Sequence, residues 1–298
     1  KTAMPCAIRC WKKSQLPTPE YRFYELDNLN LNKIDWNVFP CIVKPSFVGG
    51  GSRGVRLIKC KDELSGIIES YKAFSSNHHL ILEEFIEGTE HTIEVLIWEG
   101  KTQLMSISDK KNYPGSVTIV QDLMFPGPKG NRFREQLEIL LDEACKSLGL
   151  EYGCAHFEVI IDKEDKIWLI EVGGRPGGGL NFQPISVLST GFDYPLEYAS
   201  IITTGKPKLK KANKTYKLYW HFFNGFNGVL HKVEGWDLAV SNEDVIESGL
   251  LIKPGEKRFK EFANDLERPG HILFKYNTLE DLKNKLEFFD STVKFLST

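Results

Sequence analysis

The segment 156–172 (HFEVIIDKEDKIWLIEV) constrains the fold more than any other stretch of this sequence. Apolar and polar residues alternate on both sides of a charged turn, which predicts two antiparallel strands joined as a hairpin. With an even number of residues in the turn, Ile160 lies opposite Leu169, and Glu158 lies directly opposite Glu171. A turn with an odd number of residues would break this pairing. The hairpin therefore predicts an antiparallel sheet in which two carboxylates face each other.

The other face of this hairpin is apolar, and we expect it to form a core layer. Its members are Ala155, Phe157, Val159, Ile161, Trp168, Ile170 and Val172. Glu158 and Glu171 are neighbouring carboxylates about 5 Å apart at Cβ, and they repel each other unless a cation lies between them. Mg²⁺ typically takes one or two carboxylates together with phosphate oxygens. The pair thus predicts a magnesium site, or else two side chains that point into water on an exposed face.

A glycine-rich turn at residues 173–179 (GGRPGGG) follows the second strand and places Arg175 four residues past Glu171. Glycines let backbone N–H groups approach an anion closely, and an arginine there can neutralise developing negative charge. The alternative is a flexible turn with a surface arginine. Gly178 in this turn and His156 on the carboxylate face are candidate substrate contacts, although packing is the more common role for such a histidine.

A second glycine-rich stretch, residues 49–54 (GGGSRG), satisfies the pattern G-x-G-x-x-G. In a dinucleotide-binding fold a helix must follow this pattern, but the next residues have the composition of a strand. Strands at 40–46 and 54–59 would instead enclose a flap of the kind that covers phosphates in kinases. Lys44 lies at the end of the first of these strands, and a buried lysine needs an anion partner.

These motifs resemble the ATP-grasp superfamily in their order and spacing over about residues 1–205. The matching features are Val43-Lys44-Pro45, the flap, LEEFIEGTE at 82–90, the carboxylate hairpin and Arg175. The resemblance implies an α+β fold with two lobes whose antiparallel sheets clasp ATP, plus a small C-terminal α+β lobe. The expected segments are a linker helix at 1–20, a small lobe at 21–90, a large lobe at 91–205 and a C-terminal lobe at 206–298.

The resemblance also implies roles for individual residues. Those it assigns to ATP binding are Lys1, Lys44, Gly50, Gly51, Ser52, Glu83, Glu84, Phe85, Ile86 and Glu90. Within this set, the lysines and the flap would contact phosphates, residues 83–86 would lie at the adenine, and Glu90 would bind ribose hydroxyls. Glu158 and Glu171 would hold Mg²⁺ or Mn²⁺. Arg175 would steady an acyl phosphate and the tetrahedral intermediate that follows it.

The turn that begins at Glu171 is most similar to the L-amino acid ligase and carnosine-synthase-like branch. That likeness implies an ATP- and Mg²⁺-dependent carboxylate–amine ligase that acts through an acyl phosphate and joins an amino acid or small acid to an amino acid. Alternatives are a biotin-carboxylase-like or purine-biosynthetic ligase, or a non-catalytic ATP-binding module. Gly173 replaces the asparagine of many relatives, so one metal could lose a ligand. We also expect a Rossmann-like domain to precede Lys1 in the full-length protein.

Composition limits the partners of the chain. Lysine and arginine number 38 against 40 aspartates and glutamates, without long runs of like charge, which argues against a nucleic-acid or membrane surface. Six scattered cysteines without a C-x-x-C pair, and the lack of a signal peptide or an apolar stretch of about 18 residues, predict a cytoplasmic protein. Its expected partners are small-molecule acid and amine substrates.

Two helices and one turn complete the expectations. Helical periodicity predicts helices over 131–148 and 278–296. The run Asp109-Lys110-Lys111 follows a predicted strand and is expected to be a charged turn, with a place in an acceptor pocket as the alternative.

Overall fold

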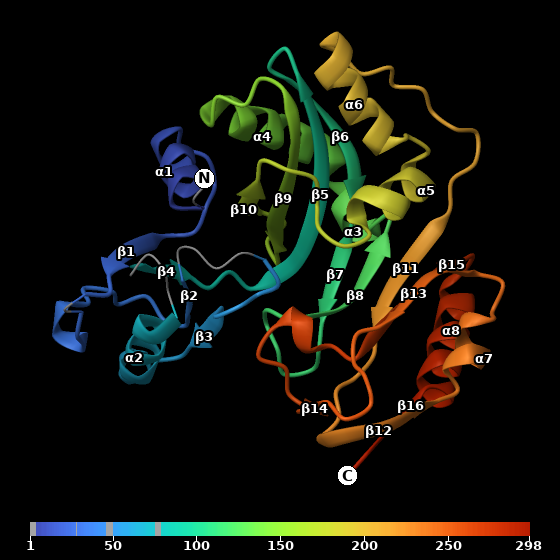
Figure 1. Ribbon diagram of the computed structural model, residues 1–298. Coiled ribbons are helices and arrows are strands. Elements are labelled where there is room, and N and C mark those ends of the chain that lie inside the picture. Colours follow the sequence, from blue (N-terminus) through green and yellow to red (C-terminus); the bar gives the residue numbers. More distant parts are fainter. Residues whose placement is uncertain (1–3, 28, 46–49, 75–78) are drawn as a thin grey trace.

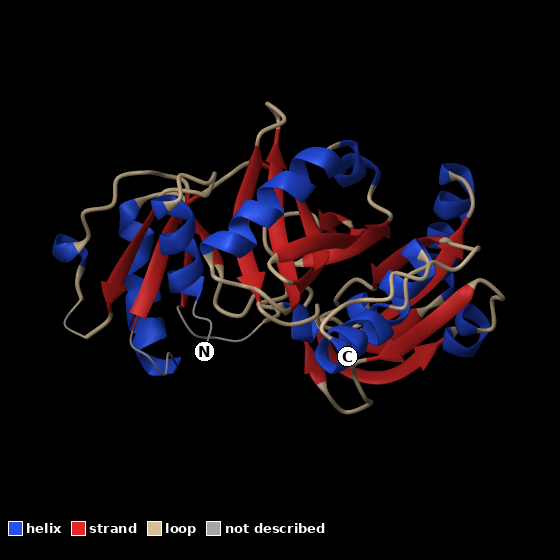
Figure 2. Cartoon of the chain, turned by 90° about the horizontal axis from the view of Figure 1, so that it is seen from above, coloured by secondary structure: helices blue, strands red, loops and turns tan. Residues whose placement is uncertain are grey.

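The computed structural model describes residues 4–27, 29–45, 50–74 and 79–298 of the chain. Their strands form four sheets with antiparallel pairing, and helices lie against the three larger ones (Figure 1). Seen from above, these three sheets follow one another from the N-terminal lobe to the C-terminal lobe (Figure 2). The α+β fold with lobes built on antiparallel sheets is confirmed.

The N-terminal lobe holds a sheet with the strand order β1-β4-β2-β3. Its strands are β1 (Tyr21–Glu25), β2 (Cys41–Pro45), β3 (Arg56–Ile58) and β4 (His79–Glu84). Helix α2 (Leu64–Phe74) packs on one face and buries Ile68 and Tyr71 against Val43 and Leu82. A strand, and not a helix, therefore follows the first glycine-rich loop, as its sequence predicted.

The central sheet has the strand order β10-β9-β5-β6. Its strands are β5 (Gly88–Trp98), β6 (Lys101–Ile107), β9 (Gly153–Asp162) and β10 (Ile167–Gly173). One face carries α1 (Met4–Lys13) and α4 (Arg134–Ser147), and the other carries α5 (Ser186–Thr190) and α6 (Tyr194–Thr204) (Figure 1). Because both faces are covered, β5 is largely apolar, with Ile93 and Val95 in one core and Leu96 in the other.

The carboxylate hairpin of β9 and β10 forms, but its register near the turn differs from the expected one. Trp168, and not Leu169, lies opposite Ile160, which is the register of a turn with an odd number of residues. A β-bulge between Leu169 and Glu171 then inserts one extra residue. Beyond the bulge the register changes by one, and Glu171 lies opposite Glu158 as predicted.

The same bulge changes which side chains of β10 reach the core. Ile167 and Leu169 pack in the central core, and so does Val172 beyond the bulge. Trp168 and Ile170, which were expected in that layer, are only partly buried. The period of two holds on each side of the bulge but not across it.

The third sheet has the strand order β13-β15-β11-β8-β7. It combines strands from before and after residue 206, the expected start of the C-terminal lobe. Its strands are β7 (Asp109–Asn112), β8 (Val120–Phe125), β11 (Lys217–Phe222), β13 (Val245–Leu250) and β15 (Gly270–Tyr276). Helices α7 (Trp236–Val240) and α8 (Leu279–Thr292) cover one face (Figure 1). A small sheet of β12 (Gly228–Glu234), β14 (Lys257–Arg258) and β16 (Lys294–Ser297) lies beside them.

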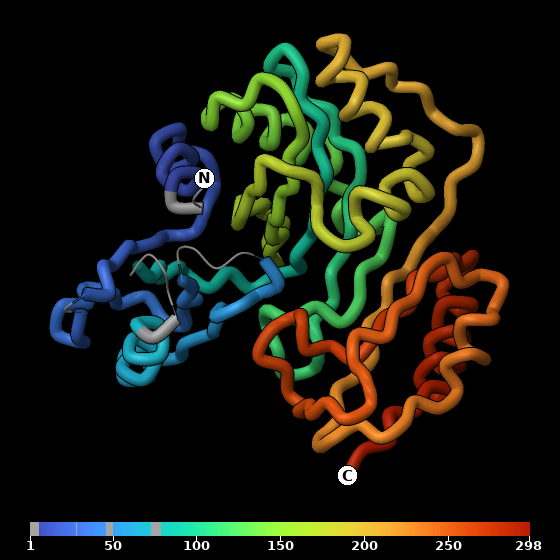
Figure 3. Tube along the Cα trace, viewed as in Figure 1, coloured from blue at the N-terminus to red at the C-terminus, as the bar shows by residue number. Residues whose placement is uncertain are grey.

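Neither of the two long helices expected from periodicity spans its whole expected range. The segment 131–148 forms α3 (Pro128–Arg132) and α4, separated at Phe133, whose φ of −104° and ψ of 17° leave the helical region. The closing helix ends at Thr292 because the residues after it pair with β12 as a strand, with Phe295 packed in the C-terminal core. The tube in Figure 3 shows this last segment leading to the C-terminus below β12. Within the described ranges, no helix has the length and apolar character needed to cross a bilayer.

Candidate functional site

The site is built around the two carboxylates of the central hairpin. Glu158 on β9 and Glu171 on β10 are direct partners in the sheet, and each side chain is partly buried. Neither therefore lies on an open surface. This juxtaposition depends on the bulge at Ile170, because the register closer to the turn would place them out of step.

A lysine that the sequence did not single out lies between the carboxylates of two strands. Lys110 Nζ is 2.6 Å from Glu90 Oε1 and 2.9 Å from Glu158 Oε1, and its side chain is 8% exposed. It lies on β7, so the expected charged turn at 109–111 is in fact a strand. Asp109 fixes the start of this strand, because its carboxylate accepts the backbone N–H groups of Lys129 and Gly130 at 2.8 and 2.9 Å.

The pKa values of the carboxyl groups at this site are shifted in different directions. Burial raises the pKa of Glu90 to about 7, helped by the charge of Glu158 and opposed by Lys110. Burial also acts on Glu158, but Lys110 and His156 outweigh it and hold the pKa of Glu158 well below its usual range. The pKa of Glu171 is raised by burial and by the negative charge of Glu158. The site thus contains more carboxylates than its cations satisfy, which favours the binding of a further cation.

Glu94 on β5 ties the second glycine-rich turn to the sheet. Its Oε1 is 2.6 Å from His156 Nδ1, and its Oε2 accepts the backbone N–H of Gly177 at 3.0 Å. A Cβ at position 177 would lie 2.0 Å from Glu94 Oε1 and 2.7 Å from His156 Nδ1, so a larger residue there would displace these two side chains. Although burial opposes the charged ring, hydrogen bonds to Glu158 and Glu94 raise the pKa of His156 to about 9. His156 is therefore part of the polar network and not a simple packing residue.

Lys44 extends the network into the N-terminal lobe. Its Nζ lies 2.7 Å from Glu83 Oε2, and both side chains are buried. The other carboxylate oxygen of Glu83 has no hydrogen-bond partner among the described residues. The charge of Lys44 partly offsets the rise that burial and Glu158 give to the pKa of Glu171. Lys1 lies outside the described residues.

Residues 85–87 connect β4 of the N-terminal sheet to β5 of the central sheet. The N–H of Glu84 donates to the carbonyl of Glu20 at 2.9 Å, and the N–H of Phe85 to that of Pro40 at 3.4 Å. Ile86 in this connection is buried. These residues therefore lie between the lobes, where the resemblance expects the adenine, but the N–H groups of Glu84 and Phe85 already have protein partners.

Arg175 does not contact the carboxylates. It is exposed, and its Nη1 donates to the carbonyl of Pro176 at 2.7 Å. Its side chain lies over Gly173, where an added Cβ would be 3.3 Å from Arg175 Cγ and 3.5 Å from Cζ. Glycine at position 173 thus leaves room for the arginine. Gly178, in the same turn, is exposed.

The first glycine-rich loop is described from Gly50 onward. Gly50, Gly51 and Ser52 have positive φ values of 35°, 76° and 55°. Ser52 Oγ donates toward the carbonyl of Thr118 at 2.8 Å. The loop therefore reaches from the N-terminal lobe to the segment that joins β7 and β8.

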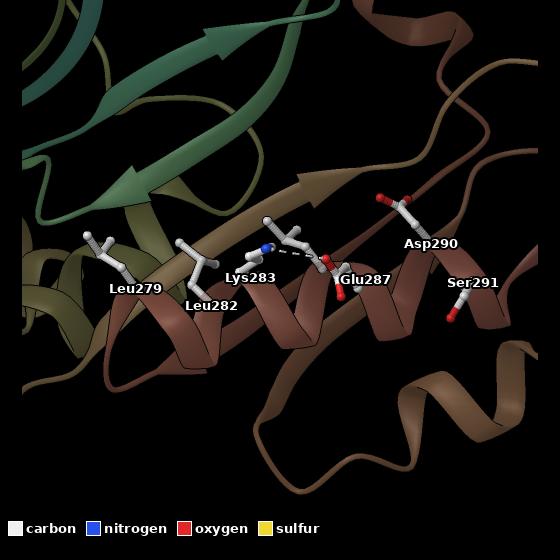
Figure 4. A pocket seen from close by; sticks show the side chains of 7 residues that line it. Leu279, Leu282, Lys283, Glu287, Asp290 and Ser291 are labelled. Carbon is white, nitrogen blue, oxygen red and sulfur yellow. Dashed lines mark ion pairs between the residues drawn. The ribbon is translucent and has the colours of Figure 1, made fainter.

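A separate groove of about 570 Å³ runs along α8 (Figure 4). Its lining includes Leu282, Leu286 and Asp290, and Asp290 Oδ1 is 3.2 Å from His221 Nε2. His221 and Trp220 are successive residues of β11, so they point to opposite faces of the third sheet. Lys110 is in register with Leu123 and Leu123 with Trp220, which puts Lys110 on the face away from this groove. The groove is therefore not part of the carboxylate site.

Residues 37–183 match the family model of the ATP-grasp domain. The D-alanine–D-alanine ligase of Buchnera aphidicola subsp. Schizaphis graminum is 29% identical over 150 residues, which cover 49% of this chain and 48% of the ligase. The chain thus spans about half the length of this curated relative.

Solved structures share the fold along almost the whole chain. The L-amino acid ligase of Bacillus licheniformis superposes with a TM-score of 0.81 at 20% identity, covering 99% of this chain and 72% of the ligase. The biotin carboxylase domain of Hydrogenobacter thermophilus 2-oxoglutarate carboxylase, in complex with magnesium ADP and bicarbonate, superposes with a TM-score of 0.67 at 16% identity. The match covers 99% of this chain and 66% of the carboxylase domain. The family match thus places an ATP-grasp domain at residues 37–183, and the fold of the chain is the ATP-grasp fold.

Proposed function

We propose that this chain is the catalytic part of an ATP- and Mg²⁺-dependent ligase that joins a carboxylate to an amine through an acyl phosphate. The observation that carries the proposal is the pairing of Glu158 with Glu171 across the hairpin, together with the ion pairs that Lys110 makes with Glu158 and Glu90. Excess carboxylates at one point between two lobes suit a divalent cation that also binds phosphate oxygens.

The residues present fit such a cation. Glu158 and Glu171 offer hard oxygen ligands on neighbouring strands, and Lys110 links Glu158 to Glu90. Within the described residues no group of three His, Cys, Asp or Glu side chains is arranged to hold a metal ion, so the cation would rest on one or two carboxylates and on phosphate oxygens. The ammonium group of Lys110 already occupies a position between two of these carboxylates, which shows that the site accommodates positive charge. When bound, Mg²⁺ would neutralise phosphate charge during transfer. Because Gly173 supplies no side chain, we propose that the protein contributes fewer ligands here than in asparagine-containing relatives.

The chemistry has two transfers. A carboxylate oxygen of the acid attacks the γ-phosphorus of ATP, the bond from that phosphorus to the β–γ bridging oxygen breaks, and ADP leaves. The amine nitrogen then attacks the acyl carbon, the bond to the phosphate oxygen breaks, and inorganic phosphate and a proton are released. Lys44 and Lys110 would bind phosphate oxygens, and Arg175 would turn from Pro176 toward the developing charge.

Amino acids are the substrates that we favour. The curated relative is named for joining D-alanine to D-alanine, and the structural neighbour is named an L-amino acid ligase. The glycine-rich turn at 173–179 is tied to the site through Gly177 and Glu94, and Gly178 beside it is exposed. The six cysteines are free, as is usual in a reducing compartment. A cytoplasmic location would provide ATP and amino acids together.

The test is release of ADP and phosphate from ATP and Mg²⁺ with pairs of amino acids, with product mass as the second readout. We expect Glu171→Gln to lower turnover by roughly 10²–10³, because it removes one charge from the cation site. Glu164→Gln is the matched control, because Glu164 lies exposed in the turn of the same hairpin.

Two results would contradict the proposal. If Glu171→Gln retained wild-type turnover, the carboxylate pair would not hold the cation. If the wild-type protein bound ATP but formed no ADP with any amino acid, bicarbonate or other small acid, a non-catalytic nucleotide-binding module would replace the ligase.

A further inference from the structure

The first glycine-rich loop is held by a turn from the far end of the chain. The N–H of Asp265 donates to the carbonyl of Gly51 at 3.0 Å, and Asp265 Oδ2 lies 3.2 Å from Ser52 Oγ. Asp265 begins the short 3-10 turn Asp265–Glu267 of the C-terminal lobe. The loop and this turn are separated by more than 200 residues, so only the tertiary fold brings them together.

The loop needs such support because of its backbone conformation. Ser52 has a φ of 55°, a region that residues with a Cβ atom rarely adopt. Its hydroxyl proton has two acceptors within reach, the Asp265 carboxylate and the carbonyl of Thr118 at 2.8 Å. A Cβ added at Gly51 would lie 3.7 Å from both Asp265 Cβ and Leu266 Cγ, so the two segments are in van der Waals contact. Contacts from outside the loop thus hold it in this shape.

Asp265 is itself fixed to the sheet that carries Lys110. Its Oδ1 accepts the N–H of Val120 at 3.4 Å and lies 3.5 Å from Arg268 Nη1. Arg268 donates through Nε to the carbonyl of Asp265 at 2.7 Å and through Nη1 to that of Val120 at 2.9 Å. The guanidinium also lies 3.5 Å above the ring of Phe222 on β11. The turn that supports the glycine loop is therefore bound to the third sheet through Val120 and Phe222.

We propose that Asp265 is a positioning residue that holds the glycine loop over the phosphates of ATP. The inference rests on the proposed function, since it needs ATP bound between the lobes. Without the Asp265 carboxylate, residues 50–52 would lose their side-chain anchor to the C-terminal lobe and keep only the backbone bond from Asp265 to Gly51, so the backbone N–H groups of the loop would meet the phosphates less often. The C-terminal lobe then contributes to nucleotide binding although it supplies no cation ligand in this scheme.

The experiment measures KM for ATP, KM for the amino acid and kcat in five proteins: wild type, Asp265→Ala, Asp265→Asn, Ser52→Ala and the double variant Ser52→Ala/Asp265→Ala. Loss of a charged hydrogen-bond acceptor should raise KM for ATP roughly tenfold or more, with KM for the amino acid unchanged. Asp265→Asn keeps an acceptor oxygen and should retain most of the affinity. In the double variant the rise in KM for ATP should be smaller than the product of the two single effects, because both changes remove the Ser52–Asp265 contact. Glu261→Ala, an exposed residue just before the turn, is the control.

The outcomes separate the two proposals. Asp265→Ala with a wild-type KM for ATP overturns the inference, while wild-type ATP-dependent ligation would still support the proposed function. A wild-type protein that does not bind ATP overturns the proposed function itself. If Asp265→Ala fails to fold by thermal melting, Ser52→Ala decides the matter, because it removes only the hydroxyl on the loop. An equal rise in both KM values would show a general structural effect and would also overturn the inference.

Discussion

Lys110 is the single residue on which the charge balance of the candidate site most depends. Its ammonium group joins Glu90 and Glu158, and the two carboxylates together raise the pKa of Lys110 despite its burial. Breaking such an enclosed arrangement by removing one partner costs more than the pair contributes, because the remaining charges stay desolvated. Lys110 thus offsets the negative charge of Glu90 and Glu158 inside the fold.

We predict that Lys110→Met lowers the free energy of unfolding by about 2–3 kcal/mol in the absence of divalent cations. This is somewhat below the ~3–5 kcal/mol for a fully buried pair, because the Glu90 and Glu158 side chains are 20% and 26% exposed. Added Mg²⁺ should restore part of the loss by taking the place of the ammonium charge. Urea unfolding with EDTA and with Mg²⁺ measures both effects.

The matched control is Lys101→Met, whose side chain is 70% exposed and whose loss should change stability little. A Lys110→Met protein as stable as wild type in EDTA would show that the carboxylates do not need this lysine.

At the scale of elements, a buried charged cluster fastens α8 to the third sheet. His221 on β11 lies 2.6 Å from Asp122 on β8 through Nδ1 and 3.2 Å from Asp290 on α8 through Nε2. Lys111 is 3.2 Å from the other oxygen of Asp122. Burial opposes the charged imidazole, but the two carboxylates prevail and raise the pKa of His221 to about 9.

This shift predicts a pH dependence of stability. A histidine with a pKa raised in the folded state stabilises fully below its unfolded pKa of about 6.5, and the contribution disappears as pH rises through about 9. We expect the free energy of unfolding to fall by up to about 3 kcal/mol between pH 6.5 and 9 from this group. His221→Gln should flatten that part of the profile, as measured by urea unfolding at several pH values.

The exposed His231→Gln provides the comparison, since it should keep the wild-type pH profile. If His221→Gln showed the same slope as wild type between pH 6.5 and 9, the cluster would not hold a proton in the folded state.

At the scale of the whole molecule, one sheet contains strands from both sides of residue 206, where the C-terminal lobe was expected to begin. Strands β7 and β8 lie before residue 206, yet they complete a sheet with β11, β15 and β13 from after it. The core of this sheet includes Leu123 and Phe125 from β8 together with Leu218 and Trp220 from β11. Lys110, a site residue, thus lies on a sheet that the C-terminal part of the chain completes.

We therefore predict that a chain ending at residue 205 will not fold cooperatively. It would expose the edge of β8 and the apolar residues that β11 covers, which favours aggregation. Size-exclusion chromatography and thermal melting provide the measurement, with the chain of 298 residues as the control. A monomeric 1–205 fragment with a cooperative transition would contradict this prediction.

Much of the fold could be read from local patterns, and the failures have local causes too. Alternation in 156–172 predicted the hairpin and the pairing of Glu158 with Glu171, but not the odd-numbered turn and the bulge that together produce it. Lys110 was missed because three charged residues in a row resemble a solvated turn, whereas here they begin an enclosed strand. Glu94 lies in an apolar strand, and nothing in its neighbourhood signals that its partners are His156 and Gly177.

The sequence by itself determined the α+β class, the strand–loop–strand around the first glycine-rich stretch and the carboxylate pair, because these depend on side-chain period and on contacts within short segments. Only the tertiary structure decided that Lys110 lies between Glu90 and Glu158 and that the turn at Asp265 supports the glycine loop. Lys110 and Glu158 are 48 residues apart, and Ser52 and Asp265 are 213 apart. Contacts of that range arise from the packing of whole sheets, which no local pattern records.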